Sequence, residues 1–228
     1  LASPWVPGVG ALSGPPLWAL AATGAVAALA VGGKPPRRRV LFPVILLLYL
    51  GVAWRGQQQV GAEGDEPHYL MVAESLLRDH DLSLEKDYAE GRYRAFYQGA
   101  PLAPHYRVRG KGGDIYSLHA VGLSLVILPA YAFGGYAGAS FFMALLAALL
   151  AREIRRLIGD WTSSAGLAEG LAWALALCPP LIHYAGLVFS EVPAALIVAA
   201  GLRLGRRLPR LGWGGTSGWA ASLAFLPW

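Results

Sequence analysis

The sequence contains few charged residues and almost no cysteine. Charged residues make up 14% of the 228 positions, whereas soluble domains carry about a quarter, and 55% of the residues are hydrophobic. The composition therefore excludes an ordinary soluble domain. Because Cys178 is the single cysteine, it also excludes an internal disulfide framework and a metal site built from several cysteines.

The beginning of the chain lacks the features of a signal peptide. The first sixteen residues contain no basic residue, and prolines at 4, 7, 15 and 16 interrupt any early helix. The chain starts at Leu1 and stops at Trp228 within an apolar run. We therefore expect it to be the N-terminal part of a longer protein.

The apolar residues are concentrated in long runs, which is typical of membrane proteins. Six runs approach the roughly 20 residues that a bilayer requires. They are Leu12–Gly33, Val40–Trp54, Leu118–Gly134, Tyr136–Ala151, Ala165–Leu181 and Leu187–Leu204, and a seventh begins near Trp213. The pattern predicts an all-α fold, a polytopic bundle of transmembrane helices.

The basic residues predict how these helices thread the membrane. Eleven of the nineteen lie in three short clusters, namely 34–39, 152–156 and 203–210. Cytoplasmic loops collect Lys and Arg, so all three clusters should lie inside the cell. This clustering also argues against a nucleic-acid partner for this basic chain. The chain must then cross once between Trp54 and Arg152, and we assign that crossing to Tyr136–Ala151.

The run Leu118–Gly134 would then lie in or along the outer leaflet, with a break at Gly134-Gly135. The alternative is a complete hairpin, which would place the 152–156 cluster outside. Under the once-crossing topology all five histidines face the outer side of the membrane. We therefore expect any chemistry to occur there.

The segment Arg55–Ser117 differs in kind from the rest of the chain. It holds ten of the fourteen acidic residues and eight of the nineteen basic ones. Connections longer than about 12–15 residues tend to be functional or disordered. Its aromatic residues and apolar spacing predict a folded, functional outer loop, which reaches residue 135 if the leaflet run is included.

The most informative motif is Gly64-Asp65-Glu66-Pro67-His68-Tyr69, which precedes an amphipathic stretch ending near Arg78. Tyr69, Val72, Ala73, Leu76 and Leu77 recur at helical spacing, with Glu66, Glu74 and Arg78 on the other face. Such a helix would lie flat on the membrane surface. Asp65 would either cap this helix or act chemically, as a general base or a metal ligand. Glu66 has the same two interpretations, because an acid also suits the first turn of a helix.

A second group of polar residues follows later in the loop. It contains His105, Arg107, Arg109 and Lys111, and then Tyr116, Ser117 and His119. These residues form either a solvated basic loop beside anionic lipids or a cationic pocket for a phosphate. Glu191, near the outer end of a later span, either caps its helix or contributes to the same site.

Together these features resemble the GT-C superfamily of polytopic glycosyltransferases, and in particular protein O-mannosyltransferases and lipid A aminoarabinose transferases. An Asp-Glu pair followed by an aromatic residue opens the first large outer loop in that family, as Asp65, Glu66 and Tyr69 do here. The segment from Tyr116 through His119 to Gly122 is similar to the family's His-Pro-Pro segment. The basic turn at 152–156 and the later acid Glu191 complete the likeness, which covers about residues 40–204.

The resemblance implies an enzyme in the bacterial inner membrane with an outward-facing active site. It would transfer a sugar from a polyprenyl-phosphate donor to a glycan, lipid or protein acceptor. Asp65 would be the catalytic base, assisted by Glu66. The substrate-binding residues would be Tyr69, His105, Arg107, Arg109, Lys111, His119 and Glu191. Any divalent metal would be held by Asp65 and Glu191.

Two other readings are compatible with the pattern. A transporter or flippase could use the same loop to gate a cavity, although little polar content lies at the middle of the spans. A noncatalytic membrane scaffold would leave the long mixed-charge loop unexplained. An intramembrane protease is not expected, since the sequence has neither a Gly-x-Ser-x-Gly motif nor a pair of mid-span aspartates.

Overall fold

The computed structural model describes residues 40–106, 110, 112–206 and 212–224. Within these ranges the chain is helical and contains no strand, only an isolated antiparallel bridge between Ser83 and Tyr116. The all-α prediction is therefore confirmed. The first expected span, Leu12–Gly33, lies outside the described residues.

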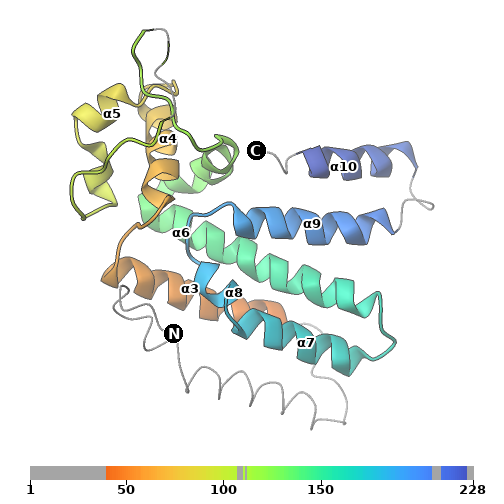
Figure 1. The fold of residues 1–228 in the computed structure, drawn as a ribbon. Coiled ribbons are helices and arrows are strands. Elements are labelled where there is room, and N and C mark those ends of the chain that lie inside the picture. Colours follow the sequence, from red (N-terminus) through yellow and green to blue (C-terminus); the bar gives the residue numbers. More distant parts are fainter. Residues whose placement is uncertain (1–39, 107–109, 111, 207–211, 225–228) are drawn as a thin grey trace.

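Long helices pack side by side in one bundle (Figure 1). Its members are α3 (Leu41–Gln59), α6 (Gly122–Gly159), α7 (Ala165–Leu177) and α9 (Glu191–Gly205), with α10 (Trp213–Ala224) against α9. The short helix α8 (Leu181–Tyr184) connects α7 to the segment before α9. Each of these long helices falls within or overlaps a run expected from the sequence.

One face of α3 fixes its place in the bundle. Leu41, Ile45, Tyr49 and Ala53 recur every four residues and are buried. The hydroxyl of Tyr49 donates a hydrogen bond of 2.7 Å to the backbone carbonyl of Ala176 at the end of α7. This bond satisfies a polar group that would otherwise be costly to bury.

Helix α6 is interrupted where Gly134 and Gly135 follow one another. Gly134 has φ −140° and Gly135 has φ +56°, so neither residue is helical. The left-handed backbone at Gly135 is strained for any residue with a side chain. The break expected from the Gly134-Gly135 pair is therefore present, and it separates a first half of α6 beside the loop from a second half in the bundle.

Gly138→Ala should destabilise the protein by about 1–3 kcal/mol, because a methyl group has no room at this bend. A Cβ at this position would lie 2.1 Å from the backbone oxygen of Ala130. Gly51→Ala, in open space on α3, is the matched control and should be neutral or stabilising by about 0.5–1 kcal/mol. Thermal unfolding of both purified variants would measure this. Equal melting temperatures would contradict the close approach.

The basic clusters gather at one end of the bundle. Glu153 on α6 accepts hydrogen bonds from Arg156 and, at 2.9 Å, from Arg203 on α9. The guanidinium of Arg152 lies 6.0 Å from the ring centre of Phe42, at the start of α3. The described members of the second and third basic clusters therefore share one end with the beginning of α3.

The opposite end of the bundle carries the loop module, the described residues within 60–121, in which α4 (Glu66–Arg78) packs against α6. The module also contains α5 (Glu85–Ala89) and the 3-10 helix η1 (Arg92–Ala95). Its own small core consists of Leu84, Tyr93, Phe96 and Ile115, all buried. The segment is therefore folded, as the sequence predicted.

Helix α4 begins and ends where expected, but the two acids of its polar face are not exposed. Glu66 and Glu74 are buried. Tyr131 on α6 donates a hydrogen bond of 2.8 Å to Glu74, and the hydroxyl of Ser124 donates one to the carbonyl of Tyr69. These two acids therefore face other parts of the protein, since α6 covers Glu74 and the segment before α9 covers Glu66.

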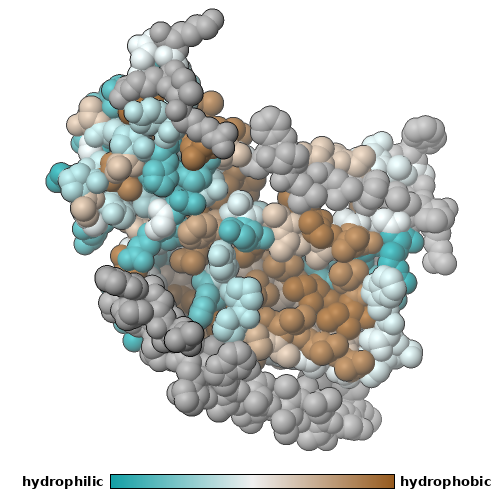
Figure 2. All heavy atoms as spheres, in the orientation of Figure 1, coloured by the Kyte–Doolittle hydropathy of each residue, from teal (hydrophilic) through white to brown (hydrophobic). Residues whose placement is uncertain are grey.

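Apolar side chains are exposed along the sides of the bundle (Figure 2). On α7, Leu167, Leu171 and Leu175 form an exposed stripe at four-residue spacing. Within the described residues one helix, α6, is long and apolar enough to cross a membrane, and 39% of its most apolar stretch is buried in the protein. Soluble proteins also contain such core helices, so this finding alone does not establish several crossings.

Candidate functional site

Asp65 lies at the N-terminus of α4, and its side chain makes no hydrogen bond to the helix. Its backbone carbonyl accepts the N–H groups of His68 and Tyr69, but its carboxylate makes no capping hydrogen bond. The side chain is 47% exposed. Capping, which was one of the two interpretations of this residue, is therefore not its role in the structure, and the carboxylate remains available to a ligand.

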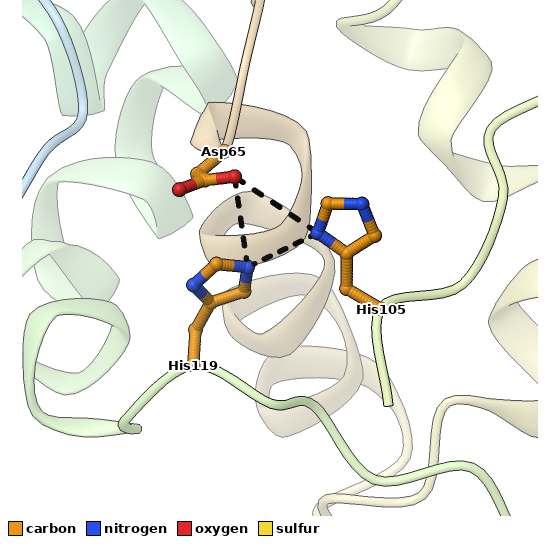
Figure 3. A group of neighbouring side chains, drawn as sticks. All are labelled: Asp65, His105 and His119. Carbon is orange, nitrogen blue, oxygen red and sulfur yellow. Dashed lines mark hydrogen bonds and ion pairs between the residues drawn. The ribbon is translucent and has the colours of Figure 1, made fainter. Parts of the chain in front are cut away.

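Two histidines from later segments converge on Asp65 (Figure 3). Oδ1 of Asp65 lies 3.9 Å from Nδ1 of His105 and 3.8 Å from Nε2 of His119. The two imidazole nitrogens are 3.4 Å apart. The second carboxylate oxygen points away from both rings. The chain thus brings together three predicted site residues that are up to 54 positions apart in sequence.

Backbone hydrogen bonds hold the two histidine segments in place. The N–H of Leu118 donates to the carbonyl of His105 at 2.9 Å, which ties the two segments together beside α4. The N–H of His119 donates to the hydroxyl of Ser117 at 3.0 Å. Burial lowers the pKa of His119, so its imidazole is neutral near pH 7 and offers a lone pair.

The ring of His68 packs against the ring of His105. The two rings stack with their centres 3.8 Å apart, and Nδ1 of His68 lies 2.9 Å from the Tyr88 hydroxyl. Burial lowers the pKa of His68 to about 4, so the ring is neutral where its Nδ1 is hydrogen-bonded to Tyr88. Tyr88 is also hydrogen-bonded to the backbone of His105. His68 and Tyr88 therefore position His105.

Tyr69 connects this cluster to the start of α9. Its ring centre lies 4.9 Å from that of His119, and its hydroxyl is hydrogen-bonded to Ser190. Burial raises the pKa of Tyr69, and the negative charges of Asp65 and Glu191 raise it further. The charges of both carboxylates therefore act on this one side chain.

Glu66, the first residue of α4, is buried and hydrogen-bonded to the backbone. It is 1% exposed, and its two oxygens accept backbone N–H groups from Val188 at 2.6 Å and from Glu63 at 3.1 Å. Burial raises the pKa of Glu66 to about 7. Glu66 therefore fastens α4 to the segment before α9, with both of its oxygens engaged by backbone N–H groups, and its expected part in catalysis stays a prediction.

The remaining predicted residues lie in the least described part of the loop. Arg107, Arg109 and Lys111, which were expected to bind a phosphate, fall outside the described residues. His105 and His119, assigned to the same phosphate pocket, instead face Asp65. One ring nitrogen of each histidine therefore lies next to the Asp65 carboxylate.

A cavity of about 330 Å³ lies next to the cluster, between the end of α3 and residues 183–189. Gly64 and Glu66 on either side of Asp65 contribute to its wall. The lining is mainly apolar, but Nε2 of Gln57 and Nε2 of His183 are buried there without a hydrogen-bond partner. Buried polar groups normally have a partner, so these two atoms suit a polar group of a bound ligand.

Sequence reasoning missed the supporting residues His68 and Tyr88. One feature could have indicated His68, because it follows Asp65 by three residues and so lies on the same side of the first turn of α4. No comparable feature marks Tyr88, whose contact depends on the fold of the loop.

No family model, curated protein or solved structure matches this chain. The assignment of function therefore rests on the residues and their arrangement.

Proposed function

We propose that this protein is a polytopic membrane glycosyltransferase that moves a sugar from a polyprenyl-phosphate donor to an acceptor on the outer face of the membrane. The observation that carries the proposal is the Asp65 carboxylate, which is uncapped, half-exposed and placed beside His105 and His119. A carboxylate in this situation can take the proton from an acceptor hydroxyl or amine.

The polarity of the bundle supports a site at the membrane boundary. The described basic residues at 152–156 and 203–206 occupy the end opposite to Asp65, and the sides of α3 and α7 expose leucines. Basic residues favour the cytoplasmic end of a membrane bundle. The Asp65 end would then face outward, where a lipid-linked donor can keep its tail in the bilayer.

The cavity beside Asp65 supports a donor that is partly apolar. Its wall is mostly hydrophobic, while Arg55 supplies a cation at its lining. A phosphate leaving group requires cationic stabilisation as the bond to the sugar breaks. Arg55 and the unpartnered nitrogen of His183 are candidates for that role, beside the basic residues expected from the sequence.

The proposal is tested with the full-length protein in membranes. Polyprenyl-phosphate sugars labelled in the sugar would be supplied, and formation of labelled product and free polyprenyl phosphate would be measured. We expect both products to depend on the protein. Movement of the intact donor across the bilayer without cleavage would instead favour the transporter alternative.

Single cysteines would test the threading in a Cys178→Ala background. Gln98 in the loop and Ser163 beyond α6 are both exposed. In intact cells an impermeant thiol reagent should label Gln98→Cys and should label Ser163→Cys only after the membrane is opened. Labelling of both from outside would overturn the once-crossing arrangement and support the complete hairpin.

A further inference from the structure

The three ligand atoms at the centre of the site surround a gap of atomic size. Oδ1 of Asp65 lies 3.8–3.9 Å from the two imidazole nitrogens, which is too far for a hydrogen bond. The nitrogens are 3.4 Å apart, at the outer limit for such a bond. Three electron-pair donors thus face one another without bonding well.

We propose that Asp65, His105 and His119 form a binding site for one divalent transition-metal ion, with Zn²⁺ as the best match. The nearest point that is equidistant from the three atoms is about 2.1 Å from each, which equals the usual zinc–nitrogen and zinc–carboxylate distances. A cation at this point would also relieve the repulsion between the three lone pairs.

The types of ligand select the class of metal. Two imidazoles and one carboxylate suit zinc and other first-row transition metals, whereas Mg²⁺ and Ca²⁺ prefer sites made of oxygen ligands. Asp65, His105 and His119 themselves form the group, and their ligand atoms all lie within 4.8 Å of one another. The sequence had suggested Asp65 with Glu191 as metal ligands, and the structure replaces Glu191 by the two histidines.

The ligands are held in place before any ion binds. His105 is stacked on His68, and its backbone is bonded to Leu118 and Tyr88. His119 packs on Tyr69. Partners of this kind orient the rings of metal-binding histidines and contribute to affinity.

The arrangement is that of a metal site with an open position. If the ligand atoms close in slightly, the ion moves out of their plane and becomes tetrahedral, and its fourth position is left to water or substrate. Asp65 and His105 are 47% and 45% exposed, so an incoming oxygen or nitrogen ligand can reach the ion. The second oxygen of Asp65 remains available to accept a proton from that ligand.

Metal binding can be tested without any substrate, so its outcome does not depend on the proposed transferase activity. The full-length protein, carrying no polyhistidine tag, would be purified in detergent, treated with chelator and titrated with Zn²⁺ by calorimetry. Co²⁺ would report the coordination geometry through its visible absorption. We expect one Zn²⁺ per chain and the absorption bands of tetrahedral cobalt.

Asp65→Asn, His105→Ala and His119→Ala should each weaken Zn²⁺ binding at least about 100-fold, since even the loss of a supporting partner costs 10–100-fold. The matched control is His80→Asn, because His80 is exposed and outside the cluster. Its φ of +59° is one that asparagine tolerates. The control should bind Zn²⁺ like the wild type.

Melting temperatures with and without Zn²⁺ would separate loss of the site from loss of the fold. Wild type and His80→Asn should be stabilised by the ion, whereas the three site variants should melt at a similar temperature with or without it. Absence of saturable binding by the wild type would overturn the proposal. Equal affinity in the wild type and in all three site variants would overturn it as well.

Discussion

Asp65→Asn should lower the rate of sugar transfer by about 10²–10⁴-fold while leaving the fold intact, because asparagine cannot act as a base. The Asp65 side chain makes no capping hydrogen bond and is 47% exposed, so its replacement leaves the start of α4 unchanged. Asparagine also suits the start of a helix. Transfer from a polyprenyl-phosphate donor would be measured in membranes at matched expression.

Asp160→Asn provides the control for this substitution. Asp160 is exposed at the end of α6, at the opposite end of the bundle from Asp65. Its variant should transfer sugar at the wild-type rate. Near-normal turnover by Asp65→Asn would show that this carboxylate is not needed and would remove the main support for the proposed function.

Metal dependence connects this prediction to the proposed Zn²⁺ site. If Asp65 acts through an ion, His105→Ala and His119→Ala should reduce transfer together with Zn²⁺ binding. If Asp65 acts alone as a base, those variants should keep most of their activity. Transfer rates thus show whether the reaction needs the ion, whereas Zn²⁺ titrations show whether the ion binds at all.

The helices were predictable from the sequence because their causes are local. Apolar runs defined α3, α6, α7 and α9, and Asp65 followed by Pro67 marked the start of α4. The break in α6 could be predicted from Gly134-Gly135, since two adjacent glycines weaken a helix. These features require no knowledge of which segments pack together.

The burial of acidic residues was not predictable, because it depends on tertiary contacts. The spacing of Glu66 and Glu74 places them on the polar side of an amphipathic helix, which normally faces water. In the structure Val188 and Tyr131, more than 50 residues away, supply hydrogen bonds to these acids. A pattern within α4 carries no information on such partners.

The site itself was recognised in part. Asp65, His105, His119 and Tyr69 were all expected to take part, but the two histidines were assigned to a phosphate on the grounds of nearby arginines. Their common orientation toward Asp65 depends on how the loop folds back across α4. That path is set by the small core of the loop, of which Leu84 and Ile115 are joined by a backbone hydrogen bond of 2.8 Å.

Arg92→Gln should open the loop module, because Arg92 holds three acidic residues together. Its guanidinium forms ion pairs with Asp79, with Asp87 at 2.8 Å and with Glu90 at 2.8 Å. The side chain of Asp87 is fully buried, and its Oδ2 has no hydrogen-bond partner. Removal of one partner from a buried ion pair costs about 3–5 kcal/mol, since it leaves an uncompensated charge.

The loss should depend on pH in a definite direction. Burial already raises the pKa of Asp87, and without Arg92 that pKa should rise further. A carboxyl group whose pKa is higher in the folded than in the unfolded state destabilises the fold. This effect grows as the pH rises above the pKa that the group has in the unfolded state. The deficit of the variant should therefore be larger at pH 8 than at pH 5.

Limited proteolysis of the full-length protein in detergent would measure this opening. A loss of about 3 kcal/mol corresponds to cleavage within residues 79–106 roughly 100-fold faster than in the wild type, if opening is in rapid equilibrium. Arg94→Gln, two residues away and exposed, should be cleaved at the wild-type rate. Because His105 follows this segment, Arg92→Gln should also weaken Zn²⁺ binding. Slow cleavage of the variant at both pH values would mean that the loop is held by its apolar core and not by Arg92.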